Sequence, residues 1–476
     1  MAFEERPPTT RQHVAFGALA LVHAGLIAAI SLIALGLPAI REEMGLEETQ
    51  LTLITAGYGL AFSGLLILGG RLGDAWGPRR TFAAGTALFG VASLAGALAP
   101  DYPLLLAARF VQGAGASLAA PAALTLAGAL FGPDRRRWAL AVWGSLSAAG
   151  AVAGLLLSGP IVAWFGWRWA FAPPVLVSLV TLAAFGAFPD LFPRVAAAPP
   201  PRLDAPGGFL VTAGLSALTY GVLALTGETA PQAAWAVTAL GVSLLALFIA
   251  VERRTPYPLL PLSFFQTGQR RLALAVIVLA AAASAATGFF LSLFLQRVRG
   301  LTPLEASTYF LPMLLIVAAG SLSGRLMRRF SPMQVATAGL GGTSLSLFLL
   351  ALWMDRGAAA AIWPALFLQP LGLGLSFSGA AVAALAGVPD HQRGLAGGVV
   401  NTAMEVGPTV GLAALVALSR TKAAAMARSG APWADAVAGG YGLALYTAAL
   451  LFALLALRVY WSRAREQRHS ESEQGA

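Results

Sequence analysis

Fourteen apolar runs, each about as long as a membrane-spanning helix or longer, follow one another along this chain. Backbone polar groups within a bilayer must find hydrogen-bond partners inside the protein, so apolar runs of this length form helices. A transmembrane β-barrel would instead show alternating segments of about ten residues. We therefore expect an all-α integral membrane protein with 14 spans. The runs cover residues 14–40, 51–71, 81–99, 104–131, 138–163, 168–188, 206–226, 233–251, 272–296, 305–327, 333–353, 358–386, 394–418 and 437–460.

The charge and cysteine content exclude several other classes of protein. Only 11% of the residues are charged and 58% are hydrophobic, whereas soluble domains carry charge on about a quarter of their residues. Without cysteine, the chain has no disulfide framework, thiolate metal site or cysteine nucleophile. The sequence contains no Walker lysine, metal-spaced histidine pair or Ser/His/Asp set. We expect no enzymatic activity, no catalytic residue, no cofactor and no metal site.

The basic residues lie in short clusters between the apolar runs. The net charge of +10 forms no Lys/Arg stripe with interleaved aromatic residues, so we expect no nucleic-acid partner. With the N-terminus placed in the cytoplasm, about two thirds of the 31 Lys and Arg residues fall on the cytoplasmic side, as the positive-inside rule requires. We expect a multi-pass protein of the cell (inner or plasma) membrane with both termini cytoplasmic.

Four local patterns occur twice, in the same order and about 255 residues apart, which indicates an internal duplication. Eight intervening spans preserve the orientation, so the repeat is parallel and related by an axis along the membrane normal. The paired patterns are Gly70-Arg71-Leu72 with Pro78 and Gly324-Arg325-Leu326 with Pro332, Phe110-x-Gln112-x-x-Gly115 and Phe367-x-Gln369-x-x-Gly372, Pro133-Asp134-x-x-Arg137 and Pro389-Asp390-x-x-Arg393, and Gly150-x-x-x-Gly154 and Gly407-x-x-x-Gly411.

The duplication predicts two six-helix bundles related by a pseudo-two-fold axis, plus two inserted helices. We assign residues 1–190 to the N-terminal bundle and residues 269–462 to the C-terminal bundle. Residues 191–268 form a linker with the two extra membrane helices, and residues 463–476 form a disordered cytoplasmic tail. Two such bundles suit transport by alternating access.

The sequence resembles the major facilitator superfamily, specifically its fourteen-span branch of drug:proton antiporters. The stretch GGRLGDAWGPRR at 69–80 is similar to the superfamily's loop 2–3 signature, and ARFVQGAGA at 108–116 is similar to its span 4 signature. Trp167-Arg168-Trp169, PLLPLSFF after Glu252, and FFLSLFLQRVRGLTP at 289–303 resemble further landmarks of the branch. The resemblance implies a major facilitator fold and proton-coupled export of amphipathic drugs or hydrophobic compounds, a multidrug-efflux function that confers drug resistance.

Two positions depart from the pattern of this branch. The acidic residue usual in span 1 is replaced by Ala29, a few residues before Gly36-Leu37-Pro38. The antiporter motif of span 5 keeps Gly150, Gly154 and Gly159 with Pro160 but lacks other prolines. The alternative is therefore an exporter of a lipid or metabolite with weak or no proton coupling. A non-transporting scaffold or receptor is a third hypothesis, which the duplicated bundles disfavour.

Loop 2–3 is the candidate gating motif, because its charges lie at a helix end where ion pairs and helix dipoles can latch one access state. The alternative interpretation is a basic loop that only sets topology. The resemblance favours gating by Gly70, Arg71, Asp74, Gly77, Arg79 and Arg80.

Three ionisable residues within spans are the candidates for proton coupling. Glu405 lies near the bilayer midplane, where an unpaired carboxylate is costly and commonly functional, and it is either a proton carrier or a protonated glutamic acid bonded to a helix neighbour. Arg109, in the span 4 motif with Gln112 and Gly113, lies below the outer interface and is either a buried functional residue or a snorkelling one. His23 is the histidine within span 1, and it either changes charge or is a neutral hydrogen-bonded residue.

Polar and aromatic side chains within other spans are candidates to line a substrate cavity, although such residues also serve as packing or interface anchors. The candidates are Tyr58, Trp143, Gln296, Tyr309, Gln369 and Asn401. The glycines of span 5 allow close helix approach, either between the moving halves or as ordinary small-residue packing. The expected partners are a small-molecule substrate, protons and the lipid bilayer, and we expect a monomer.

Overall fold

The structure is a computed structural model that describes residues 10–131, 150, 152–193, 205–225, 231–255, 258, 262–356, 362–388, 399–400, 403–404 and 407–474. Throughout these residues the regular elements are helices. Nine helices in the described part of the chain are long and apolar enough to cross a membrane. The all-α integral membrane class predicted from the sequence is confirmed.

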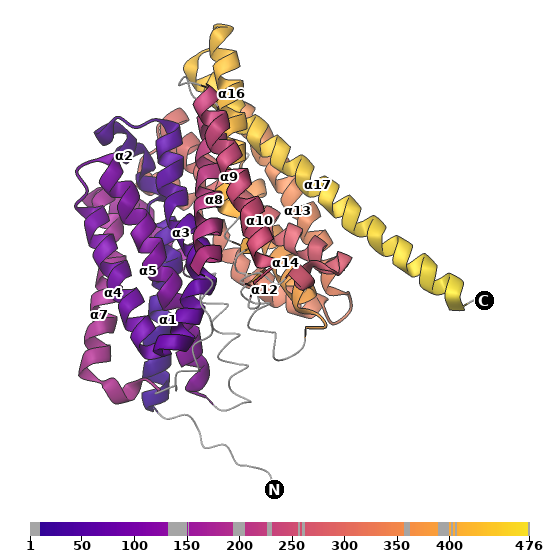
Figure 1. The fold of residues 1–476 in the computed structure, drawn as a ribbon. Coiled ribbons are helices and arrows are strands. Elements are labelled where there is room, and N and C mark those ends of the chain that lie inside the picture. Colours follow the sequence, from indigo (N-terminus) through magenta and orange to yellow (C-terminus); the bar gives the residue numbers. More distant parts are fainter. Residues whose placement is uncertain are drawn as a thin grey trace. The chain divides into compact units, whose positions relative to one another are not determined.

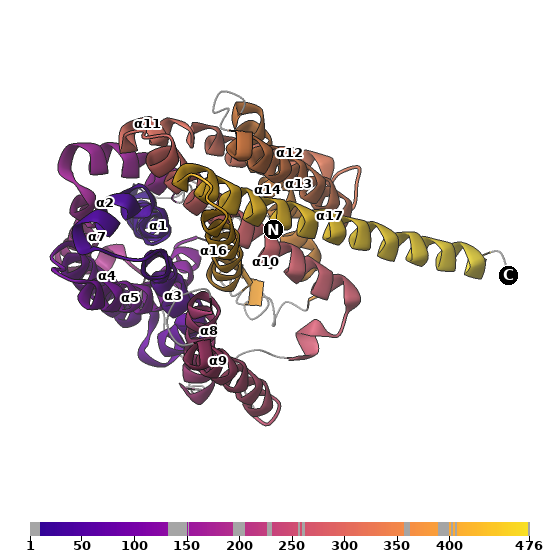
Figure 2. The same cartoon turned by 90° about the horizontal axis from the view of Figure 1, so that it is seen from above.

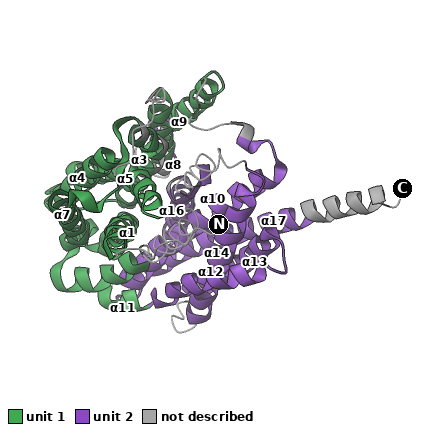
Figure 3. Cartoon of the chain, turned by 90° about the horizontal axis from the view of Figure 1, so that it is seen from below, with its two compact units in different colours: residues 1–221, 235–260, 301–308 green, residues 222–234, 261–300, 309–476 purple. Residues whose placement is uncertain are grey.

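The chain divides into two compact units, which Figure 3 colours separately. Unit 1 contains Met1–Gly221, Trp235–Leu260 and Leu301–Thr308, and unit 2 contains Val222–Ala234, Pro261–Gly300 and Tyr309–Ala476.

Unit 1 is built on helices that run side by side, with α5 in contact with α1, α3 and α4, and α7 in contact with α1 and α4 (Figures 1 and 2). Its elements are α1 (Thr10–Ser31), η1 (Ala34–Gly36), α2 (Leu37–Met44), α3 (Glu48–Trp76), α4 (Pro78–Ala97), α5 (Tyr102–Ala129), a helix at Val152–Phe165, η2 (Trp167–Phe171), α7 (Ala172–Ala187), η3 (Pro189–Leu191), most of α8 (Ala205–Ala224) and α9 (Pro231–Glu252), and α11 (Pro303–Thr308).

Unit 2 packs α14 against α10, α12 and α13, while α17 lies along α13 and α16. Its elements are η4 (Leu262–Phe265), α10 (Gly268–Leu293), η5 (Phe294–Val298), η6 (Leu311–Leu314), α12 (Leu315–Leu326), α13 (Pro332–Arg356), α14 (Ile362–Leu385), η9 (Gly407–Gly411), α16 (Leu412–Arg428) and α17 (Trp433–Gln474). η5 and η9 are π-helical. α17 continues as helix to Gln474, beyond residue 462, where the sequence predicts a disordered tail.

Local capping explains where several of these helices begin. The Asp101 carboxylate accepts a hydrogen bond from the backbone N–H of Leu104 at 3.0 Å and so starts α5. Glu47 and Gln50 form a reciprocal capping box at the start of α3. Gly77 has a φ of 89°, a conformation that favours glycine, and Pro78 follows as the first residue of α4. These features set the register of the helices that carry the candidate site.

Close packing of α4 on α5 in unit 1 is repeated by α13 on α14 in unit 2. A Cβ atom on Gly115 would lie 2.5 Å from the backbone nitrogen of Phe89, and one on Gly372 would lie 2.6 Å from the backbone nitrogen of Thr343. Gly85 and Gly339 make the reciprocal contacts, against the carbonyl oxygens of Gly115 and Gly372 respectively. Only glycine permits helix backbones to approach so closely. Gly115 and Gly372, and likewise Gly85 and Gly339, are about 255 positions apart, which is the spacing of the sequence repeat.

Candidate functional site

Arg109 forms the centre of a buried polar cluster in unit 1. The side chain projects from α5 and is 1% exposed. Its Nε donates to the carbonyl oxygen of Ile54 on α3 at 3.2 Å, and its Nη1 donates to the carbonyl oxygen of Ala29 on α1 at 3.1 Å. One guanidinium therefore links three helices. Of the two alternatives left by the sequence, this geometry agrees with a buried Arg109 and not with a snorkelling one.

Gln112 and Tyr58 complete the cluster around this guanidinium. Arg109 Nη1 also donates to Gln112 Oε1 at 2.7 Å, and Gln112 Nε2 donates to Ser93 Oγ on α4 at 2.8 Å. The guanidinium carbon lies 4.9 Å from the ring centre of Tyr58, whose hydroxyl donates to the carbonyl oxygen of Leu26 at 2.8 Å. Tyr58 and Gln112 are both buried, so this cluster is shielded from solvent.

The guanidinium has neutral partners throughout the described residues. They are two backbone carbonyls, one amide oxygen and one aromatic ring, and Arg109 Nη2 makes no hydrogen bond to any described residue. Buried charges are usually paired with an opposite charge, because burial without compensation is costly. Ala29, where the branch usually carries an acid, places its backbone carbonyl against Arg109. The cluster is therefore a fixed positive charge held by dipoles.

At the equivalent positions of unit 2 the glutamine is kept but the charge is absent, and the glutamine binds α10 in place of the α4 contact made by Gln112. Gln369 corresponds to Gln112 in the internal repeat, is 1% exposed, and donates from Nε2 to Thr287 Oγ1 at 2.5 Å. Leu366 stands at the repeat position of Arg109 and is 4% exposed. The repeated fold therefore accepts leucine where unit 1 has a buried arginine, so the two units differ chemically at equivalent positions.

Loop 2–3 places its predicted gating residues around the turn between α3 and α4. Arg71 is half-buried at the end of α3, Arg79 is half-buried at the start of α4, and Arg80 is exposed. The hydroxyl of Thr81 donates to the carbonyl oxygen of Gly77 at 3.2 Å and so fixes the turn. A Cβ atom added to Gly70 would lie 3.8 Å from the Cβ of Pro121, which is an ordinary van der Waals distance.

Two of these arginines bind backbone carbonyls far along the chain. Arg71 Nη2 donates to the carbonyl oxygen of Pro258 at 2.8 Å. Arg79 Nη1 donates to the carbonyl oxygen of Phe192 at 3.3 Å. The side chain of Asp74, the acidic member of the motif, lies outside the described residues.

The span 5 glycines pack against α1, and their repeats pack against α10. A Cβ on Gly150 would lie 2.6 Å from the carbonyl oxygen of Ala24, and one on Gly154 would lie 2.5 Å from that of Ala28. In unit 2, Gly407 meets the carbonyl oxygen of Val278 and Gly411 meets the Cβ of Ala282. Each pair of contacts lies within one unit. Gly159, which precedes Pro160, lies against Pro303 and Ser307 of α11 in unit 1, and Gly113 lies against the Tyr58 carbonyl.

The other predicted site residues are dispersed. His23 is buried on α1, and Gln296 lies in the π-helical η5, where its Nε2 donates to Ser292 Oγ at 3.1 Å. Tyr309 stacks on Trp363, with ring centres 4.9 Å apart. The remaining predictions, Glu405, Trp143 and Asn401, lie outside the described residues.

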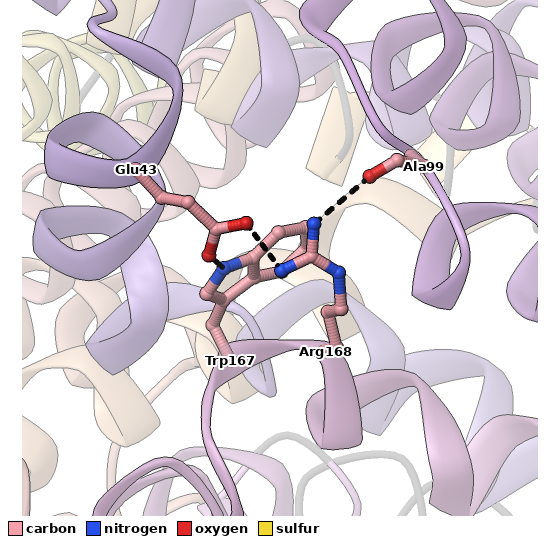
Figure 4. Close-up of polar contacts among 4 residues, drawn as sticks. All are labelled: Glu43, Ala99, Trp167 and Arg168. Carbon is pink, nitrogen blue, oxygen red and sulfur yellow. Dashed lines mark hydrogen bonds and ion pairs between the residues drawn. The ribbon is translucent and has the colours of Figure 1, made fainter.

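A polar clamp not anticipated as a site joins three parts of unit 1 (Figure 4). Glu43 on α2 accepts hydrogen bonds from Trp167 Nε1 at 2.7 Å and from Arg168 Nη1 at 2.5 Å. Arg168 Nη2 also donates to the carbonyl oxygen of Ala99 at 3.2 Å, and its guanidinium lies over the ring of Trp167. Gly166, with a φ of 90°, turns the chain so that both side chains face Glu43. In the sequence, only the Trp167-Arg168-Trp169 motif pointed to the residues of this clamp.

Replacing Glu43 with glutamine is expected to lower stability by less than about 1 kcal/mol, because both side chains of the ion pair are partly exposed. Arg168→Ala is expected to lower stability further, since it also removes the bond to Ala99 and the contact with Trp167. Thermal unfolding midpoints of the purified protein at low and high salt measure both effects. The Glu43→Gln effect should shrink as salt screens the pair; an effect independent of salt would contradict the electrostatic assignment.

A multi-pass helical chain with duplicated helix packing and a buried, charged cluster inside one unit has the architecture of a membrane transport protein. The family model described as Major Facilitator Superfamily matches residues 19–412. The chain belongs to the major facilitator superfamily, and the resemblance identified from its motifs is confirmed. It is a transporter and not an enzyme.

Several curated relatives align over most of both chains. The Lincomycin resistance protein of Streptomyces lincolnensis is 37% identical over 397 residues, covering 82% of this chain and 80% of the relative. The Puromycin resistance protein of Streptomyces alboniger is 34% identical, with 89% and 86% covered. The Multidrug efflux pump of Mycolicibacterium smegmatis is 30% identical, with 85% and 80% covered.

A solved structure supports the fold independently. The in meso crystal structure of a POT family transporter superposes with a TM-score of 0.67, covering 96% of this chain and 99% of that chain. Its sequence identity is 15%, so this likeness concerns the fold alone.

Proposed function

We propose that this chain exports amphipathic drugs or hydrophobic compounds across the cell membrane by alternating access, driven by inward proton movement. The observation that carries the proposal is the extended similarity to the lincomycin and puromycin resistance proteins, at 37% and 34% identity. The similarity to a multidrug efflux pump supports the same substrate class. The duplicated packing of α4 on α5 and α13 on α14 supports two related moving bodies.

The proposed architecture has 14 spans: two six-helix bundles at 1–190 and 269–462, an inserted pair of helices within 191–268, and a tail at 463–476. Both termini are cytoplasmic in this arrangement, and the working unit is a monomer. Nine apolar helices in the described ranges are compatible with this count. The clustering of basic residues between the apolar runs supports the orientation.

Proton coupling is proposed to involve Glu405, Arg109 and His23. A carboxylate within a span can take up and release a proton during the cycle, and Glu405 is the acidic residue placed there by the sequence. The fixed charge of Arg109 contributes an electrostatic bias that any proton entering unit 1 must overcome. Loop 2–3, with Gly70, Arg71, Asp74, Gly77, Arg79 and Arg80, is proposed to gate the cycle.

The alternative function is export of a lipid or metabolite with weak or no proton coupling. One observation favours it: within the described residues, Arg109 is surrounded by neutral groups, and the backbone of Ala29 occupies the place of an acid. In the part of the chain that the structure describes, the guanidinium has no carboxylate partner, and an arginine side chain by itself does not release its proton.

Resistance and accumulation assays test the proposed function. The wild-type chain is produced in a bacterium that lacks its major efflux pumps, and the same strain carrying the empty vector is the control. Cells with the wild-type chain should accumulate less of a lipophilic cation, lincomycin or puromycin than control cells, and a protonophore should abolish the difference. Equal accumulation of every compound in both strains would contradict drug export, whereas export that resists the protonophore would favour the alternative.

A further inference from the structure

The segment that carries α8 and α9 begins and ends at carbonyl groups bound by loop 2–3. We define the insert as residues 192–258. The carbonyl oxygen of Phe192, at its start, accepts a hydrogen bond from Arg79. The carbonyl oxygen of Pro258, at its end, accepts a hydrogen bond from Arg71. Both donors and both acceptors belong to unit 1.

Aromatic contacts hold the Arg79 connection in place. The guanidinium carbon of Arg79 lies 5.1 Å from the ring centre of Phe185 on α7. The rings of Phe185 and Phe192 lie 4.8 Å apart, and Phe192 is 1% exposed. A cation over an aromatic face is attracted by the ring quadrupole, so the same side chain binds both the last turn of α7 and the start of the insert.

Helix packing brings the insert back to α3, which carries Arg71. A Cβ on Gly64 of α3 would collide with Thr212 of α8, and one on Gly208 of α8 would lie 3.4 Å from Leu68 of α3. The inserted helices also pack closely on each other, since a Cβ on Gly241 of α9 would lie 2.5 Å from the backbone nitrogen of Leu218 on α8. Packing contacts therefore connect α3 to α8 and α8 to α9, and Pro258, at the end of the insert, is bound by Arg71 of α3.

We propose that Arg71 and Arg79 are positioning residues that fasten the two ends of the insert to the turn between α3 and α4. The insert braces this turn, and the two parts move together during transport. Gly77 and Thr81 shape the turn so that the two arginines reach separate carbonyls from α3 and α4. This fastening assigns the inserted helices a mechanical role in unit 1. Its effect on transport rests on the proposed function.

Cysteine alkylation tests each connection separately, because the chain contains no native cysteine. Pro193 and Pro258 are half-buried prolines beside the two connections, and Pro258→Cys retains the carbonyl that accepts from Arg71. Each single-cysteine protein is treated in native membranes with a water-soluble maleimide, and the alkylation rate is measured. Arg80→Ala is the matched control, since Arg80 belongs to the same loop and is exposed.

The proposal predicts two separate effects. Arg71→Ala should raise the alkylation rate at residue 258 roughly tenfold, with little change at 193, and Arg79→Ala should do the reverse. Arg71→Lys and Arg79→Lys should restore most of the protection, because lysine still donates to a carbonyl oxygen. Arg80→Ala should change neither rate. Unchanged rates in both alanine variants, or equal increases in Arg80→Ala, would overturn the proposal.

Transport in the same proteins separates this proposal from the proposed function. Export should fall in Arg71→Ala and Arg79→Ala at unchanged protein levels and recover in the lysine variants. Loss of protection at 193 and 258 in a protein that exports none of the tested compounds would support the brace and contradict the substrate assignment. Normal export by alanine variants that have lost protection would overturn the mechanical role of the brace.

Discussion

Replacing Arg109 with leucine is expected to leave a folded protein that no longer exports. Leucine is the residue found at the equivalent repeat position, Leu366, where unit 2 buries it in the same helix-packing framework. Substituting an apolar residue of similar size for a buried charge is often neutral for stability, because the desolvation of the charge is relieved. The Ile54 carbonyl lies within α3, where an intrahelical hydrogen bond remains available to it, whereas Ala29 lies in the last turn of α1, whose carbonyls lack intrahelical partners.

The expected loss of function follows from what leucine cannot replace. Arg109 links α1, α3 and α5 by charge-assisted hydrogen bonds, each contributing about 1.5–3 kcal/mol. When one such interaction is lost from the transition state of a transport step, that step becomes about tenfold slower or more. Arg109→Lys should also be impaired, because a single ammonium group does not reproduce the planar fork that reaches two carbonyls.

Initial export rates and size-exclusion profiles of the purified variants measure this prediction. Leu366→Met, a volume-conserving change at the repeat position, is the matched control and should retain export. Wild-type export by a properly folded Arg109→Leu protein would show that the charged cluster has no part in transport. An aggregated Arg109→Leu protein would contradict the inference from the repeat.

Replacing Gly154 with alanine is expected to destabilise the protein by about 1–3 kcal/mol. The added Cβ would lie 2.5 Å from the carbonyl oxygen of Ala28, and its neighbours are backbone atoms of α1, which cannot rotate away. The helix at Val152–Phe165 would have to separate from α1. The contact recurs between Gly411 and Ala282, so Gly411→Ala should have an effect in the same direction.

Gly17→Ala in α1 is the control for this substitution. An added Cβ at Gly17 meets no atom within 4 Å, so alanine there should be neutral or stabilise the helix by roughly 0.5–1 kcal/mol. Thermal unfolding midpoints in detergent compare the variants. A Gly154→Ala midpoint equal to or above that of Gly17→Ala would contradict the close packing at this position.

The class of fold and the duplication were predictable from the sequence. Apolar length determines membrane-spanning helices, and the spacing of Gly150 and Gly154 matches that of Gly407 and Gly411. The partners of these glycines were not predictable. Ala24 and Ala28 carry small side chains in an alanine-rich helix, so neither stands out in the sequence until the backbone contact is seen.

The polar contacts of Arg109, Arg71, Arg79 and Glu43 were predictable only in part, because the sequence does not mark their partners. The position of Arg109 within an apolar run left burial and snorkelling open, and two of its acceptors are backbone carbonyls, which every residue carries. Arg71 and Arg79 likewise bind backbone oxygens, so no residue type marks their partners. The Glu43 clamp depends on a side chain 124 residues from Trp167, a pairing that requires the fold.

Coupling of substrate export to proton movement is measured in liposomes with an imposed pH gradient. The wild-type chain, Glu405→Gln and Arg109→Leu are reconstituted, and the efflux of a lipophilic cation is followed together with internal pH. We expect proton flux that depends on the substrate in the wild-type protein and disappears in both variants. Substrate efflux by the wild-type protein without any proton flux would contradict this coupling.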